Sequence, residues 1–141
     1  MSQKYKLRSV IICDDVRQEV SGKEILIGVY SYSMLFPSFP SIVPKLVIRI
    51  FMDLLDRTAK NFELNWKDPN GTPIANFKTQ LPQAIPNEPL LLGFLIGPLT
   101  FNIEGVYPVE LSLENEPAET IYDMEIRLPK DDLERSRVPA P

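Results

Sequence analysis

The chain has 141 residues, 44% hydrophobic and 24% charged, which is enough for one folded domain and too apolar for a disordered chain. Its net charge of -4 and dispersed basic residues argue against nucleic acid and anionic membranes as partners. With no histidine and one cysteine, histidine-dependent catalysis and the usual zinc sites are excluded. We therefore expect a protein that is not an enzyme and holds no cofactor or metal.

Proline is unusually frequent, with 14 residues spread along the chain. Each interior proline in a helix removes a hydrogen bond and clashes with the preceding turn, so this spacing favours short strands joined by loops. We expect a single β-sandwich domain over residues 1–128. A flexible, charged and proline-containing tail is expected over residues 129–141.

The first two predicted strands enclose a dense cluster of charges. The first strand is expected over Leu7–Cys13 and the second over Glu24–Ser33, with a turn at Ser21-Gly22 between them. In the second strand the pattern places Ile25, Ile27 and Val29 on one side. The charges that lie within eleven residues of one another are Asp14, Asp15, Arg17, Glu19, Lys23 and Glu24.

The rest of the chain alternates between strand patterns and loops. The proline-rich segment Met34–Pro44 is expected to be an ordered loop, and Leu81–Pro89 a second loop. Asp68-Pro-Asn-Gly71 is the sharpest hairpin signal, because Asn-Gly accepts the positive φ angles of a tight turn. The remaining strands are expected over Lys45–Leu55, Phe62–Lys67, Pro73–Lys78, Leu90–Ile103 (with a break near Gly97-Pro98), Glu104–Glu114 and Thr120–Leu128.

About seven to nine short strands separated by turns indicate an all-β, antiparallel sandwich, and two details favour an immunoglobulin-like one. Trp66 lies in a strand just before the predicted hairpin. Tyr107, within Gly105-Val-Tyr-Pro-Val109, resembles a tyrosine corner, in which a tyrosine opening the penultimate strand hydrogen-bonds back to the chain. In this interpretation Val109 occupies the place of the second cysteine of antibody domains.

Three interpretations of the charge cluster remain open. Asp15, Arg17 and Glu19 have the two-residue spacing of an ion ladder on one face of a strand. Alternatively, the cluster is a recognition surface in which Arg17 and Lys23 bind a partner's carboxylates, or Asp14 and Asp15 accept from its donors. The third interpretation is a hard cation such as calcium, held by Asp14, Asp15 and Glu19, although no known loop spacing supports it.

Two further features need an interpretation. Met34, Leu35, Phe36 and Phe39 form an apolar loop, which either presents a patch to a partner or closes the open end of the sandwich over the core. Cys13 is expected to be a buried and inert cysteine at a strand end. A reactive thiol is disfavoured there, because the two neighbouring aspartates would raise its pKa.

Several motifs resemble the signature of a small family of bacterial proteins that is a domain of unknown function, over most of the chain up to about residue 128. The resemblance implies a bacterial, single-domain, intracellular protein, and it implies no activity and no catalytic residues. The motifs that carry it are Cys13-Asp-Asp-Val-Arg-Gln-Glu19, Gly22-Lys23, Leu26-Ile-Gly-Val-Tyr30, Phe36-Pro, Phe39-Pro40, Pro44-Lys-Leu and Asp68-Pro-x-Gly71.

The function expected from these observations is a non-enzymatic binding or assembly module whose partner is a protein or a second copy of the chain. The alternative is a carboxylate-based metal-binding or small-ligand-binding protein centred on Asp14, Asp15 and Glu19. We expect a cytoplasmic location, because residues 1–6 contain no apolar leader, the apolar run over residues 89–98 is too short to span a bilayer, and one cysteine cannot form an intramolecular disulfide.

Overall fold

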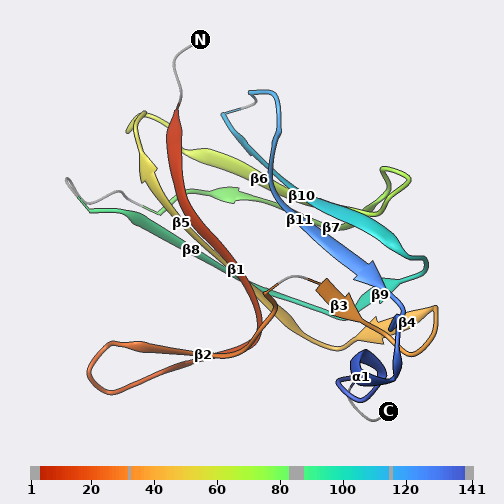
Figure 1. The fold of residues 1–141 in the computed structure, drawn as a ribbon. Coiled ribbons are helices and arrows are strands. Elements are labelled where there is room, and N and C mark those ends of the chain that lie inside the picture. Colours follow the sequence, from red (N-terminus) through yellow and green to blue (C-terminus); the bar gives the residue numbers. More distant parts are fainter. Residues whose placement is uncertain (1–3, 32, 83–87, 115, 139–141) are drawn as a thin grey trace.

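Two β-sheets pack face to face in the computed structural model, which describes residues 4–31, 33–82, 88–114 and 116–138 (Figure 1). Sheet A has the strand order β2-β1-β5-β8, sheet B has β3-β11-β10-β6-β7, and β4 pairs with β9 in a separate ribbon. The predicted all-β sandwich is therefore confirmed. The strands are β1 Tyr5–Gln18, β2 Glu24–Val29, β3 Ser33–Leu35, β4 Ser41–Val43, β5 Leu46–Leu54, β6 Asn61–Lys67, β7 Pro73–Gln80, β8 Leu90–Ile96, β9 Leu99–Phe101, β10 Gly105–Leu113 and β11 Glu119–Arg127.

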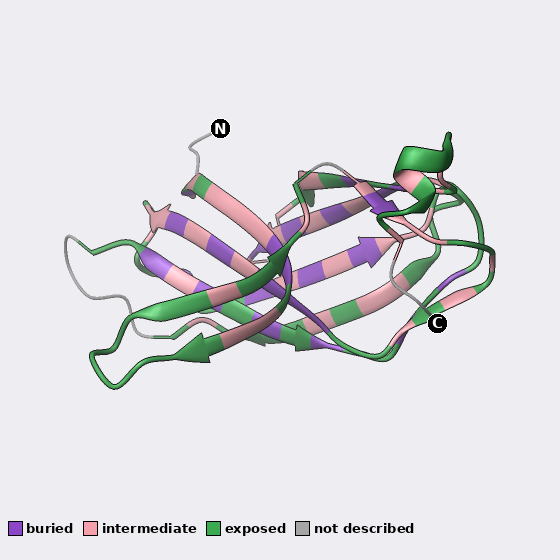
Figure 2. Cartoon of the chain, turned by 60° about the horizontal axis from the view of Figure 1, so that its bottom comes forward, coloured by how far each residue is buried: buried purple, intermediate pink, exposed green. Residues whose placement is uncertain are grey.

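The core lies between the two sheets and follows the period-2 alternation of the sequence. Figure 2 shows this as alternating bands of buried and more exposed residues along the strands. The rings of Phe62 in sheet B and Phe94 in sheet A meet edge to face across the interface, with centroids 5.4 Å apart. The alternation predicted for three strands is confirmed by the buried residues Ile48, Ile50 and Met52 of β5, Phe62, Leu64 and Trp66 of β6, and Tyr107, Val109, Leu111 and Leu113 of β10.

The predicted hairpin at Asp68-Pro-Asn-Gly71 joins β6 to β7. The Asp68 carboxylate oxygen Oδ1 accepts hydrogen bonds from the backbone N–H groups of Asn70 and Thr72, at 2.9 and 2.8 Å. Gly71 has a φ of 86°, a left-handed conformation that favours glycine. The turn therefore takes its geometry from local chemistry, as the sequence predicts.

The side chains of Tyr107 and Trp66 both donate hydrogen bonds to the backbone. One links β10 to the segment before it, and the other links β6 to β10. The Tyr107 hydroxyl donates to the backbone oxygen of Ile103, at 2.7 Å, which is the bond back to the chain expected of this tyrosine. Trp66 Nε1 donates to the backbone oxygen of Tyr107, at 3.2 Å, and Trp66 lies opposite Val109 in the strand register. These bonds satisfy the polar groups of two large buried side chains.

The structure has eleven strands among its described residues, more than the seven to nine expected. β1 continues through the charge cluster to Gln18 instead of ending at Cys13, and the predicted strand Glu24–Ser33 divides into β2 and β3. β2 ends at Val29, one residue after Gly28 with its left-handed φ of 69°, and β3 joins the other sheet parallel to β11. The segment expected to be a proline-rich loop contributes both β3 and β4.

After β11 the chain forms one helical turn, α1 (Asp132–Arg135), where the sequence predicts a flexible tail. Asp131 caps it by accepting from the N–H of Glu134, at 2.8 Å, and the Arg127 guanidinium pairs with the Glu134 carboxylate. Residues 139–141 of the predicted tail and residues 83–87 of the loop predicted over Leu81–Pro89 lie outside the described part of the chain. No helix among the described residues is long and apolar enough to cross a membrane.

Candidate functional site

A two-stranded arm projects from the sandwich where β1 parts from its neighbour. The part of β1 up to Cys13 pairs with β5, and the part from Cys13 onwards pairs with β2. We call residues 14–29, which comprise the end of β1, the turn and β2, the arm. Figure 1 shows it extending away from the other strands, and β2 has no second neighbour in the strand order of the described residues.

The arm carries an apolar stripe that faces solvent. Ile25, Ile27 and Val29 are exposed to 45%, 39% and 49%, and no residue of the arm belongs to the buried core. In the register they lie opposite Arg17, Asp15 and Cys13. The predicted shared face of the three apolar residues therefore exists, but it is turned outwards.

The Asp14 carboxylate bonds to Tyr30 and occupies the space that a side chain at Gly28 would fill. The Tyr30 hydroxyl donates to Asp14 Oδ1, at 2.7 Å. The carboxylate lies directly against Gly28, where an added Cβ would meet Asp14 Oδ2 at 2.2 Å. Burial and the Asp14 carboxylate both raise the pKa of Tyr30, which keeps its proton in this hydrogen bond.

Asp15 lies at the base of the arm and faces two cations. Its Oδ1 is 3.2 Å from Lys45 Nζ and accepts from the Val16 N–H at 2.9 Å, while Oδ2 is 3.8 Å from Arg17 Nε. The hydrogen bond from Lys45 is the largest cause of a lowered pKa at Asp15, followed by the bond from Val16. Asp15 is therefore an ionised group that ties the arm to the segment just before β5.

A second ion pair links the far end of the arm to sheet A. The Glu24 carboxylate of β2 pairs with the Arg49 guanidinium of β5. The Arg49 side chain reaches over Gly93 of β8, where an added Cβ would meet one guanidinium nitrogen at 2.2 Å. Arg49 has a side-chain exposure of only 16%, so the arm covers part of the outer face of sheet A.

Glu19 and Lys23 lie at the turn of the arm. Glu19 accepts a hydrogen bond from the Ser21 hydroxyl, at 3.3 Å, and its backbone N–H donates to the Lys23 oxygen at 2.8 Å. Within the predicted ladder, Asp15 and Arg17 contact each other. Asp14, Asp15 and Glu19 each have a different partner, and no three ligand residues of the described chain are grouped as a metal would require.

The predicted apolar patch lies at the end of the sandwich and packs against its core. Met34 is fully buried, and Leu35 is half-buried beside it in β3. The Phe36 ring stacks on Phe101 with centroids 5.4 Å apart, and Phe39 meets Phe36 edge to face at 6.0 Å. Met34 therefore belongs to the core and offers no surface to a partner, and Phe36 and Phe39 pack against the core.

Cys13 is completely buried, yet it lies outside the main core cluster. It pairs with Val47 on one side and with Val29 on the other, on the outward face of sheet A. Its thiol donates weakly to the Asp15 backbone oxygen, at 3.5 Å, and burial raises the thiol pKa. The cysteine is buried, as the sequence predicts, but at the base of the arm instead of at a strand end.

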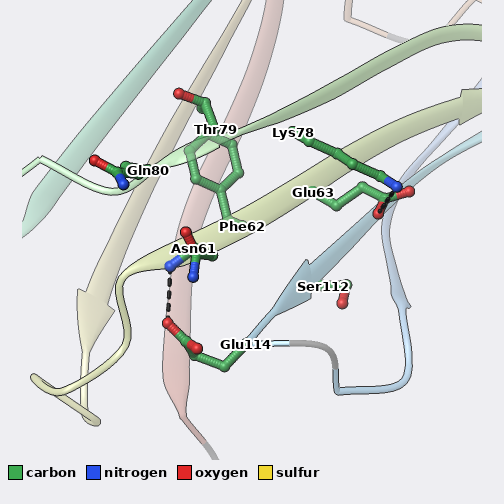
Figure 3. Close-up of a pocket in the computed structure, with 8 residues that line it drawn as sticks. All are labelled: Asn61, Phe62, Glu63, Lys78, Thr79, Gln80, Ser112 and Glu114. Atoms are coloured by element: carbon green, nitrogen blue, oxygen red, sulfur yellow. Dashed lines mark hydrogen bonds and ion pairs between the residues drawn. The ribbon is translucent and has the colours of Figure 1, made fainter.

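A shallow depression of about 580 Å³ lies on sheet B, between β6, β7 and β10. Figure 3 shows two contacts among the residues that line it, one between Glu63 and Lys78 and one between Asn61 and Glu114. Glu63 is 3.6 Å from Lys78, and Glu114 accepts from the Asn61 N–H at 2.8 Å. The Ser112 hydroxyl donates to the Glu116 oxygen at 2.6 Å. Because the depression is shallow and the Glu63, Glu114 and Ser112 side chains already bond within the protein, we do not regard it as a site.

The partners that position the charge cluster were not found from the sequence. Tyr30, Lys45 and Arg49 all bond to carboxylates of the arm, and the last two lie more than twenty residues further along the chain. One signal was available, because an isolated glycine within a strand often marks the close approach of another group. Gly28 and Gly93 both mark such approaches here.

The fold and the arm define a β-sandwich with a projecting hairpin. The chain belongs to the family described as "Family of unknown function (DUF6941)", whose model matches residues 8–127. This confirms the predicted membership of an uncharacterised family. A search of curated proteins finds no match.

Proposed function

We propose that the protein is a non-enzymatic binding module in which the β2 edge of the arm accepts an extended segment of a protein partner. The observation that carries the proposal is the free edge of β2 together with its half-exposed residues Ile25, Ile27 and Val29. A strand added there would gain backbone hydrogen bonds from the edge and side-chain contacts from the apolar stripe.

The sequence of β2 supports this role, because natural sheets normally protect their edges. Charged residues, proline and short strand length are the usual means of preventing unwanted strand pairing. Between Ile25 and Val29 the strand has neither a charge nor a proline. Gly28 has a left-handed φ within β2, so we propose that the partner strand pairs regularly over Glu24–Ile27 and that Val29 adds a side-chain contact beyond it.

The charges around the stripe would set the specificity of the partner. Arg17 is 73% exposed in its side chain and lies opposite Ile25. Lys23 lies just before β2 on the exposed turn. Since charged groups at the rim of an interface steer association and reject unsuitable partners, we propose a partner segment that is β-branched at its centre and acidic at its ends.

We further propose an immunoglobulin-like topology for the sandwich and a cytoplasmic, bacterial setting for the protein. The order of β1, β5 and β8 against β11, β10 and β6, the Tyr107 bond and the Trp66–Val109 pair support the topology. The family resemblance and the single, buried cysteine support the setting.

The test compares proteins retained from a bacterial lysate by three forms of the immobilised chain. Ile27→Lys places a charge at the centre of the stripe, and Val106→Lys makes the same change at a comparably exposed valine of β10. We expect a partner set that the wild type and Val106→Lys retain and Ile27→Lys loses. Retention of the same set by Ile27→Lys, or no specific retention by the wild type, would contradict the proposal.

A second copy of the chain is one of the partners that this experiment must recognise. Light scattering of the purified wild type across a range of concentrations shows whether the chain binds itself. If it forms a dimer that Ile27→Lys dissociates, the accepted segment is β2 of another copy. If it remains monomeric while the lysate experiment succeeds, the segment belongs to a different protein.

A further inference from the structure

The arm shares few backbone contacts and no core residues with the rest of the sandwich. The backbone of β2 pairs only with β1 in the described sheets, and no side chain of residues 14–29 belongs to the buried core. In Figure 2, where the bottom of the molecule comes forward, the arm lies in front of sheet A. Beyond Cys13, where the backbone of β1 still pairs with β5, the arm contacts the rest of sheet A through side chains.

Two of those contacts are ion pairs. Glu24 pairs with Arg49 at the far end of the arm, and Asp15 pairs with Lys45 at its base. The side chains of all four residues are partly exposed. Ion pairs of this kind contribute little stability and are weakened by salt.

Two side chains beside the base of the arm are buried outside the core. Cys13 and Val47 are buried on the outward face of sheet A although neither belongs to the core cluster. The ionisable groups near the Cys13 thiol include Asp14 and Asp15 of the arm, Arg49 of β5, and Tyr30, which directly follows the arm. If the arm left the sheet, Cys13 and Val47 would become accessible while the core remained intact.

We propose that the arm is a latch that opens as a unit about Cys13, is held closed by the Glu24–Arg49 and Asp15–Lys45 ion pairs, and uncovers an apolar strip on sheet A without unfolding of the sandwich. Segments with few buried apolar contacts open at a lower free energy than the core they are attached to. The latch does not depend on the proposed partner of β2, since it is defined by contacts within the chain.

The chain contains one reporter for each part. Cys13 is its only cysteine and lies under the arm, whereas Trp66 is its only tryptophan and lies in the core. The rate at which a thiol reagent such as 5,5′-dithiobis(2-nitrobenzoate) modifies Cys13 therefore measures arm opening. The fluorescence of Trp66 in denaturant measures unfolding of the sandwich.

The experiment compares the wild type with Glu24→Gln and Arg49→Gln, and with Glu63→Gln as the control. Glu63 pairs with Lys78 on the other sheet, so the control loses an ion pair that the latch does not use. We expect Glu24→Gln and Arg49→Gln each to speed Cys13 modification by about 2- to 5-fold, with little further gain when they are combined. The Trp66 transition and the Glu63→Gln labelling rate should match those of the wild type.

Salt supplies an independent test on the unchanged chain. Raising sodium chloride from about 0.05 M to about 1 M shortens the screening length from about 14 Å to about 3 Å. Cys13 modification should therefore accelerate in the wild type and much less in Glu24→Gln. The latch is refuted if Cys13 reacts only at the rate set by the Trp66 unfolding equilibrium, or if neither the variants nor salt change its rate.

Discussion

Gly28 and Gly93 stand within strands, and each leaves room for a charged side chain from a neighbouring strand. Asp14 lies against Gly28 and Arg49 lies across Gly93. In both cases the charged group then reaches a partner that a Cβ would have blocked, namely Tyr30 for Asp14 and Glu24 for Arg49. Two missing side chains therefore position the hydrogen bond and one of the ion pairs on which the arm depends.

Replacing Gly28 by alanine should loosen the arm. The left-handed φ of 69° costs about 1–2 kcal/mol for a residue with a Cβ, and the new methyl group would also displace the Asp14 carboxylate. Gly22→Ala is a matched control, because Gly22 has a φ of 86° and open space around it. Amide hydrogen exchange of the arm should accelerate more in Gly28→Ala than in Gly22→Ala. Equal acceleration would mean that contact with Asp14 contributes nothing.

At the scale of single elements, the arm and helix α1 are both attached to the sandwich by ion pairs. The arm is attached through Glu24 and Asp15, and helix α1 is attached through Glu134, whose carboxylate pairs with Arg127 at the end of β11. Neither the arm nor α1 contributes a residue to the buried core. Their positions therefore depend on charge, whereas those of β5, β6 and β10 depend on buried apolar surface.

Helix α1 should lose its attachment in acid. The hydrogen bonds from Arg127, and then from the Lys130 N–H, lower the pKa of Glu134 from 4.5 to about 2. Because the folded pKa lies below the unfolded one, this stabilisation is complete above about pH 4.5 and is lost as the pH falls towards 2. A carboxyl titration by nuclear magnetic resonance, with the α1 amides as reporters, measures both events.

Two variants identify the partner that lowers the Glu134 pKa. Arg127→Gln should return this pKa towards 4.5, since it removes the bidentate guanidinium. Glu125→Gln keeps the guanidinium and removes only the more exposed carboxylate that lies 3.3 Å from Arg127 Nε. The Glu125→Gln variant should therefore leave the pKa of Glu134 below its ordinary value. A Glu134 pKa near 4.5 in the wild type would contradict the ion pair with Arg127.

For the whole molecule, Cys13 marks the boundary between the residues that complete the sandwich and the residues that form the arm. Tyr5 to Cys13 completes sheet A beside β5, and Tyr30 returns to the same place by donating its N–H to the Ile12 oxygen at 2.9 Å. The intervening residues form the arm. The chain therefore leaves the sandwich and re-enters it at neighbouring positions, which is a geometry that tolerates deletion.

A chain in which Asn-Gly replaces residues 14–28 should still fold. The two residues can form the tight turn that joins Cys13 to Val29, which already lie opposite each other. Trp66 should keep its native fluorescence, and the free energy of unfolding should fall by no more than about 2 kcal/mol from renewed exposure of Cys13 and Val47. Exposure of Trp66 in this variant would show that the arm is part of the core.

The sequence by itself determined the sandwich, the hairpin at Asp68–Gly71, the Tyr107 bond and the buried faces of β5, β6 and β10. These follow from period-2 alternation and local turn chemistry, which act between near neighbours in the chain. Only the tertiary structure decided that β2 faces solvent and that its charges meet Lys45 and Arg49. Apolar alternation shows that a strand has one apolar face, but the strand that covers that face, if any, is set by pairings between distant parts of the chain.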